Sequence, residues 1–175
     1  MKISAVLNVH SKPEVVCDTV DSIRTYMTDD VLMVVDGASC EFEGRQQVRT
    51  IKGFRHNVAR SPYRNMALGW MSLVNLHPDS DWYCYIEYDC LVASNRFRRN
   101  LEMADDRGVW MMGNDGRVDE EAMPLVESLI GGKFKSPYYL IGACQFFSKH
   151  FMAKLSGINF FERFLNLTNE FSDGI

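Results

Sequence analysis

The first forty residues place two apolar runs on either side of one amphipathic segment, and this order constrains the fold more than any other feature of the chain. The runs are Ile3–Val9 and Val31–Val35, and their β-branched residues are typical of strands buried on both faces. Between them, Pro13 opens a segment whose apolar residues recur at helical spacing as far as Met27. Proline is well tolerated at the first helical position. The order strand, helix, strand predicts a βαβ unit, with a parallel sheet and a right-handed crossover.

The alternation of predicted strands and helices continues along the rest of the chain. Further strands are predicted over 48–53, 82–86, 108–112 and 138–147, the last of them broken at Gly142. Further helices are predicted from 61 toward 78 and over 94–105, 119–129 and 149–167, the last with breaks near Gly157. No repeat, low-complexity tract or linker separates these segments. We therefore expect one α/β domain over residues 1–175, either whole or truncated at its C-terminus.

The charge and the cysteine content exclude several classes of protein. A net charge of −4, with 24% charged residues, does not fit the basic surface that binds nucleic acid. The five cysteines are odd in number and form no CxxC pair, which favours reduced thiols in a cytoplasmic protein over a disulfide framework. No apolar run approaches the roughly 20 residues of a transmembrane segment. Peripheral contact with a membrane remains compatible with the sequence.

Polar residues follow most of the predicted strands, and three of these polar segments carry acids. In an open parallel sheet, ligands bind outside the carboxyl ends of the strands. The segments are 8–11, 36–39, 87–89, 114–115 and 142–145. We expect the side chains of a binding site among them.

The strongest local signal is the acid pair Glu87 and Asp89, two residues apart where an aromatic strand ends. Positions i and i+2 share one face of a strand. Two like charges held together are unfavourable without a cation between them, and Mg²⁺ and Mn²⁺ prefer carboxylate oxygen. The alternative is two solvated acids in a loop. The neighbouring Tyr85 and Tyr88 are expected in the core, although Tyr88 could also stack on a sugar or a base.

The order of these segments resembles that of GT-A glycosyltransferases, in particular the family-2-like group. The resemblance rests on a strand and polar turn over 3–11, a strand followed by Asp36-Gly37-Ala38-Ser39, the pair Arg64-Asn65 at a helix start, and Glu87-Tyr88-Asp89 as a DxD-type motif. It covers roughly residues 2–150. It implies an α/β fold of the GT-A type, with a mostly parallel central sheet flanked by helices on both faces.

The resemblance implies a nucleotide pocket built from the first two strand ends. Asp36 would accept a hydrogen bond from the base, which is most often uracil in this family. The base and the ribose would be lined by Asn8, Val9, His10 and Ser11.

The resemblance also implies residues for the phosphates, the metal and the acceptor. Arg64 would neutralise phosphate, because a guanidinium group matches phosphate oxygens with two parallel hydrogen bonds. Glu87 would meet the ribose or the donor sugar, and Asp89 would bind the Mn²⁺ or Mg²⁺ that bridges the diphosphate. Gly142 and Ala143 resemble the small residues that line the acceptor side.

The activity implied by the resemblance is transfer of a sugar from a nucleotide-diphosphate donor, with UDP-sugars favoured, to a hydroxyl group on a glycan, a lipid-linked carrier or another acceptor. It supplies no catalytic base, because Glu162, Glu170 and Asp173 stand in no matching context. The alternative is a non-catalytic or truncated module that binds nucleotide sugars. Nucleotidyltransferases fit less well, since no glycine follows the first strand between Asn8 and Lys12. Dinucleotide-dependent oxidoreductases lack support because no GxGxxG follows any strand.

Overall fold

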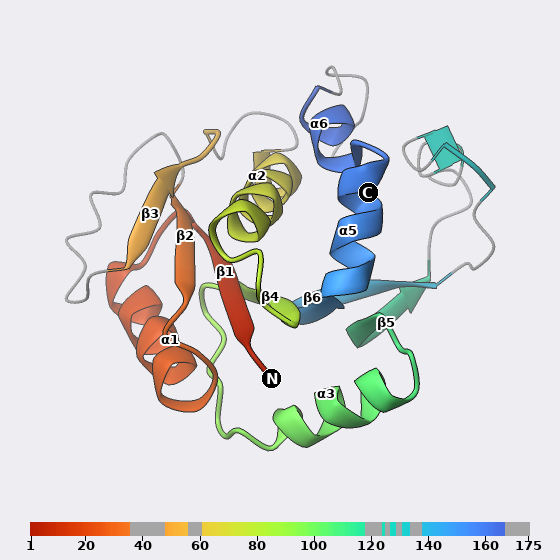
Figure 1. The fold of residues 1–175 in the computed structure, drawn as a ribbon. Coiled ribbons are helices and arrows are strands. Elements are labelled where there is room, and N and C mark those ends of the chain that lie inside the picture. Colours follow the sequence, from red (N-terminus) through yellow and green to blue (C-terminus); the bar gives the residue numbers. More distant parts are fainter. Residues whose placement is uncertain are drawn as a thin grey trace.

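The structure is a computed structural model that describes residues 1–35, 48–55, 61–117, 124, 127–128, 131–133 and 138–166 (Figure 1). Within these ranges, six strands form one sheet in the order β3-β2-β1-β4-β6-β5. The strands are β1 (Ile3–Val9), β2 (Val31–Val35), β3 (Arg49–Lys52), β4 (Trp82–Glu87), β5 (Met111–Arg117) and β6 (Tyr138–Ser148). The helices are α1 (Pro13–Tyr26), α2 (Ser61–Leu76), α3 (Phe97–Asp106), α5 (Lys149–Gly157) and α6 (Phe160–Leu165).

The sheet is mostly parallel, as the sequence predicted. β1 is parallel to β2 and to β4, and β2 is parallel to β3. β6 runs antiparallel to both of its neighbours, β4 and β5. β6 is therefore the one reversed strand of the described sheet.

Helices cover both faces of the sheet, in agreement with the GT-A resemblance (Figure 1). One core cluster joins α1 and α3 to the sheet through buried side chains that include Ile23 and Leu101. A second cluster joins α2, α5 and α6 to the opposite face through Trp70, Met152 and Phe161. No helix in the described ranges is long and apolar enough to cross a membrane.

Two polar segments that the sequence placed after strand ends lie inside strands. Residues 114–115 belong to β5, which extends from Met111 to Arg117 instead of ending at 112. Residues 142–145 belong to β6. The prediction ended this strand too early, because its second half has polar and glycine residues where a strand pattern needs apolar ones. A register shift between Gly113 and Asn114 marks the change.

One predicted helix begins later than expected, and another lies mostly outside the described residues. α3 begins at Phe97 instead of 94, because the residues before it form a turn in which the Arg98 N–H donates to the Asn95 carbonyl. The predicted helix over 119–129 falls mostly outside the described residues. The final helical stretch does break after Gly157, into α5 and α6.

Gly69 allows α2 to pack close to the sheet. A Cβ atom at this position would lie 2.8 Å from Val6 Cγ2 and 3.1 Å from Val34 Cγ2. Both valines are fully buried in the cluster beneath α2, so neither has free space to move into. The missing side chain therefore sets the distance between α2 and strands β1 and β2.

We predict that Gly69→Ala lowers the free energy of unfolding. Alanine gains about 1 kcal/mol in helix propensity, but the added methyl overpacks the core at a cost of about 1–3 kcal/mol. Urea denaturation followed by circular dichroism measures the difference. Gly157→Ala is the matched control, because a Cβ there meets nothing within 4 Å. Equal stability of Gly69→Ala and wild type would show that α2 can move away from the sheet.

Candidate functional site

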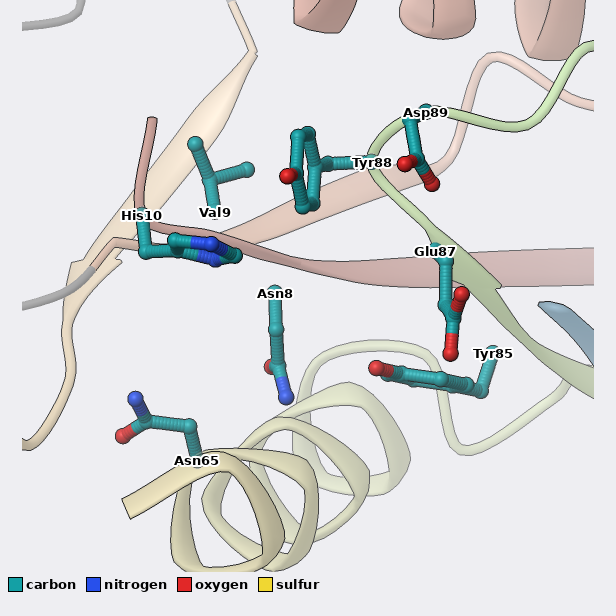
Figure 2. A pocket seen from close by; sticks show the side chains of 8 residues that line it. All are labelled: Asn8, Val9, His10, Asn65, Tyr85, Glu87, Tyr88 and Asp89. Carbon is teal, nitrogen blue, oxygen red and sulfur yellow. The ribbon is translucent and has the colours of Figure 1, made fainter. Parts of the chain in front are cut away.

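A pocket opens at the carboxyl ends of β1 and β4 (Figure 2). These strands are parallel neighbours, and Asn8 of β1 lies opposite Glu87 at the end of β4. The segments that follow the two strands therefore leave the sheet side by side. The pocket has a volume of ≈ 300 Å³ and is lined by Asn8, Val9, His10, Asn65, Tyr85, Glu87, Tyr88 and Asp89.

A hydrogen-bonded turn directly after β4 forms the acidic rim of the pocket. The Cys90 N–H donates to the Glu87 carbonyl over 3.1 Å and closes the turn. The carboxylates of Glu87 and Asp89 and the sulfur of Cys90 lie within 4.8 Å of one another. Both carboxylates are exposed, whereas Cys90 is half-buried. Burial, and then the charges of Asp89 and Glu87, raise the pKa of the Cys90 thiol.

The donor set of this turn fits a divalent cation. Oxygen ligands lie about 2.1 Å from Mg²⁺, so two ligands on opposite sides of the ion are about 4.2 Å apart. The ligand atoms of the turn lie within 4.8 Å of one another, which is slightly more than this separation. Small rotations about side-chain bonds would bring them to binding distance. Glu87 and Asp89 would then hold the ion and leave its other positions open.

Helix α1 holds the loop that carries this rim. The Thr19 hydroxyl donates to the Tyr88 carbonyl over 2.6 Å, and Thr19 is fully buried. Ser22, one turn further along α1, accepts a hydrogen bond from the Val92 N–H over 3.0 Å. The rim is therefore attached to a helix of the core.

Tyr85 and Asn8 form a neutral floor beneath the acids (Figure 2). Tyr85 is 9% exposed, and its side chain is hydrogen-bonded to that of Asn8. Burial, and then the charge of Glu87, raise the pKa of Tyr85 well above its usual value. The Tyr85 hydroxyl therefore stays protonated beside the carboxylate of Glu87.

Asn65 forms the wall of the pocket on the α2 side. Its amide nitrogen donates to the Phe54 carbonyl over 3.0 Å, and its amide oxygen accepts from the Phe54 N–H over 2.5 Å. These bonds tie the first turns of α2 to the chain that leaves β3. Arg64, the preceding residue, lies over the Phe54 ring at 3.9 Å from its centroid, a favourable cation–π distance.

Tyr88 joins the turn after β4 to the turn after β1. Its ring meets the His10 ring edge to face, with centroids 4.7 Å apart and planes at 80°. The Ser11 hydroxyl donates to the Tyr88 hydroxyl over 3.5 Å. Tyr88 also packs against the core cluster beneath α1, so it serves both the core and the pocket.

The structure brings five of the predicted site residues to one pocket, namely Asn8, Val9, His10, Glu87 and Asp89. Ser11 contacts Tyr88 at the edge of the pocket. Arg64 is not among the lining residues and stacks on Phe54 instead. Asp36 lies outside the described residues. The binding roles of all these residues remain predictions.

The predicted acceptor-side residues Gly142 and Ala143 lie in β6, next to the pocket edge of the sheet. Cys144 of β6 pairs with Ile86 of β4. Because the two strands are antiparallel, the residues before Cys144 continue in the direction in which β4 reaches the pocket. Their part in acceptor binding also remains a prediction.

Three residues around the pocket were not expected there from the sequence, namely Asn65, Tyr85 and Cys90. Tyr85 was expected only in the core, yet it shares a strand face with Glu87 through their spacing of two residues. Asn65 directly follows Arg64 in the segment that carries the family resemblance. Cys90 directly follows the acid pair, and the i to i+3 hydrogen bond of the turn brings it back toward Glu87.

Comparison with known proteins shows the fold. No family model matches the chain, and no curated protein matches it. A cytidylyltransferase from Leptospira borgpetersenii is 9% identical, with a TM-score of 0.53 over 90% of this chain and 65% of that chain. Glucosyl-3-phosphoglycerate synthase from Mycobacterium tuberculosis, in complex with Mn²⁺, UDP-glucose and phosphoglyceric acid, is 16% identical, with a TM-score of 0.49 over 85% of this chain. The chain spans 57% of the length of that synthase. The chain thus shares its α/β fold with that cytidylyltransferase.

We predict that Thr19→Val lowers the free energy of unfolding by about 1–3 kcal/mol, because valine keeps the shape but leaves the Tyr88 carbonyl without its donor. Thr25→Val is the matched control, since the Thr25 hydroxyl is exposed and bonds within the same helix to Asp21. It should change stability by less than about 0.5 kcal/mol. Chemical denaturation of both variants measures this. Equal effects of the two substitutions would contradict a special role of Thr19.

Proposed function

We propose that this chain is the nucleotide-sugar-binding part of a metal-dependent glycosyltransferase, which moves a sugar from a nucleotide-diphosphate donor to a hydroxyl acceptor. The observation that carries the proposal is the convergence of Asn8, Glu87 and Asp89 on one pocket at the ends of two parallel strands. Ligands of open α/β sheets bind at this position. UDP-sugars are the favoured donors, on the family resemblance of the sequence.

The charges of the pocket support a metal-dependent mode of binding. The described residues that line it include two carboxylates and no lysine or arginine. A diphosphate would be repelled by these acids unless a cation stood between them. Glu87 and Asp89 would hold Mn²⁺ or Mg²⁺ on the protein side, and the diphosphate would occupy the positions that remain open. The ion, when bound, would supply stabilisation of the charge on the departing diphosphate.

The size of the pocket supports binding of part of the donor. Its volume of ≈ 300 Å³ is at the lower end of about 300–1,000 Å³ for small-molecule sites. The pocket would therefore take the diphosphate and the ribose, with the protonated Tyr85 hydroxyl and the Asn8 amide as neutral partners. The base would extend toward the carboxyl end of β2, which Asp36 follows in the sequence.

A nucleotidyltransferase is the second candidate, because the cytidylyltransferase from Leptospira borgpetersenii shares the fold at a TM-score of 0.53. Against it stands the segment from Asn8 to Lys12, which contains no glycine and so no flexible phosphate-binding loop after β1. A third possibility is a module that binds nucleotide sugars without turnover. Release of free sugar or its transfer, measured with radiolabelled UDP-sugar, separates an enzyme from such a module.

We predict that UDP together with Mn²⁺ stabilises the chain, and that a chelator removes the effect. A ligand present at 100 times its dissociation constant adds about 2.7 kcal/mol to the free energy of unfolding. Thermal denaturation measures this, with UDP or with CTP, each in the presence of Mn²⁺ or of EDTA. Stabilisation by CTP but not by UDP would favour the nucleotidyltransferase. Stabilisation by UDP that survives EDTA would contradict the metal-dependent mode.

We predict that Asp89→Asn weakens Mn²⁺-dependent binding of UDP. Loss of an outer-shell partner of a metal costs about 10- to 100-fold in affinity, and loss of a ligand carboxylate should cost at least as much. Isothermal titration calorimetry with UDP at saturating Mn²⁺ measures the change. Asp106→Asn, an exposed acid at the end of α3, is the matched control. An unchanged affinity in Asp89→Asn would remove this residue from the site.

A further inference from the structure

The rim turn contains a cysteine sulfur beside its two carboxylates. Glu87, Asp89 and Cys90 place their ligand atoms within 4.8 Å of one another. No other group of three His, Cys, Asp or Glu side chains in the described parts of the chain comes as close. The Cys90 sulfur lies 4.0 Å from Asp89 Oδ1. The set therefore combines two hard oxygen donors with one soft donor.

The donor types decide which cations such a set prefers. Mg²⁺ takes oxygen ligands in a near-ideal octahedron and keeps several waters. Thiolate sulfur favours softer or borderline ions, among them Zn²⁺, with a metal–sulfur distance of about 2.3 Å. A site with oxygen ligands only would show no such bias.

The geometry points to Cys90 as a third protein ligand of the cation held by Glu87 and Asp89, which gives the site a preference for sulfur-accepting ions such as Zn²⁺ and Co²⁺ over Mg²⁺. This inference rests on the proposed function, because it concerns the ion of the same site. When the ion binds, the Cys90 S–H bond breaks, the proton leaves to solvent, and a sulfur electron pair forms the bond to the metal. The step needs no oxidant or reductant.

The backbone already has the shape that this ligand set requires. The turn is closed by the hydrogen bond from the Cys90 N–H to the Glu87 carbonyl and is held to α1 through Thr19. The ligand atoms at the first, third and fourth positions of the turn lie within 4.8 Å of one another. In a tetrahedral site, an oxygen at about 2.1 Å and a sulfur at about 2.3 Å from the ion would be about 3.6 Å apart. The distance of 4.0 Å between the Cys90 sulfur and Asp89 Oδ1 is close to this separation.

The competing role of Cys90 is packing. Its side chain is half-buried and lies against the core cluster beneath α1. Free cysteine often behaves as a small apolar residue. A packing residue would influence stability but would leave the choice of cation unchanged, and this difference makes the inference testable.

The experiment titrates the full chain with Co²⁺ and records the absorption spectrum. We expect a near-ultraviolet thiolate-to-cobalt charge-transfer band in the wild type and its loss in Cys90→Ser and Cys90→Ala. The alanine variant excludes the serine oxygen as a substitute ligand. Cys17→Ser, a half-buried cysteine on α1, is the matched control and should keep the band. Calorimetry should show the ratio of Zn²⁺ to Mg²⁺ affinity falling at least about tenfold in Cys90→Ala.

Two outcomes would overturn the inference, and they are distinguishable. If Co²⁺ binds and Asp89→Asn abolishes binding, but the band is absent or persists in Cys90→Ala, then Cys90 is no ligand and the metal site of the proposed function stands. If Co²⁺, Zn²⁺ and Mn²⁺ all fail to bind with or without UDP, the proposed function falls as well. Circular dichroism of each variant verifies that it is folded.

Discussion

The parallel pairing of β1 with β4 is the interaction on which the rest of the site depends. It sets Asn8 opposite Glu87, and it brings the turns after both strands to the same edge of the sheet. A slip of one residue would turn every side chain of a strand to the opposite face. Such a slip is prevented by the core, because apolar residues of β1 and β4 are buried in the clusters on both faces. The position of the pocket is thus a consequence of core packing.

The rim is precise because it is tied to a helix of the core. A buried hydroxyl such as that of Thr19 costs free energy unless it is hydrogen-bonded, and its partner is the Tyr88 carbonyl of the rim. The same polar contact therefore satisfies the helix and positions the turn. Asn65 does the equivalent on the other wall, where it joins α2 to the chain after β3. Sites held by regular elements and supporting hydrogen bonds keep their geometry better than sites on free loops.

The sequence predicted the parallel half of the fold well, because strands buried on both faces are continuous apolar runs and the helix between them has a clear period. The prediction failed for segments that have neither a continuous apolar run nor a clear period. The polar second half of β5 carries no strand pattern, and the direction of β6 leaves no mark on its own residues, so 114–115 and 142–145 were placed after strands instead of within them. Tyr85 was missed for another reason. An aromatic residue in a buried strand fits a core role, and only the structure shows that its hydroxyl end reaches the pocket.

The division of charge in the pocket has a thermodynamic consequence for how its ligands bind. The exposed carboxylates stand at the mouth, while the floor is neutral, because burial and the nearby Glu87 keep the Tyr85 hydroxyl protonated. Under the proposed function, a cation that enters the mouth would relieve the repulsion between the two acids, and the acids would no longer repel a phosphate that follows it. Each ligand would therefore raise the affinity for the other by the same factor, since coupling between two binding sites is reciprocal. Under the proposed function, such a rim would select the cation and the diphosphate together, and neither ligand alone would gain the full interaction.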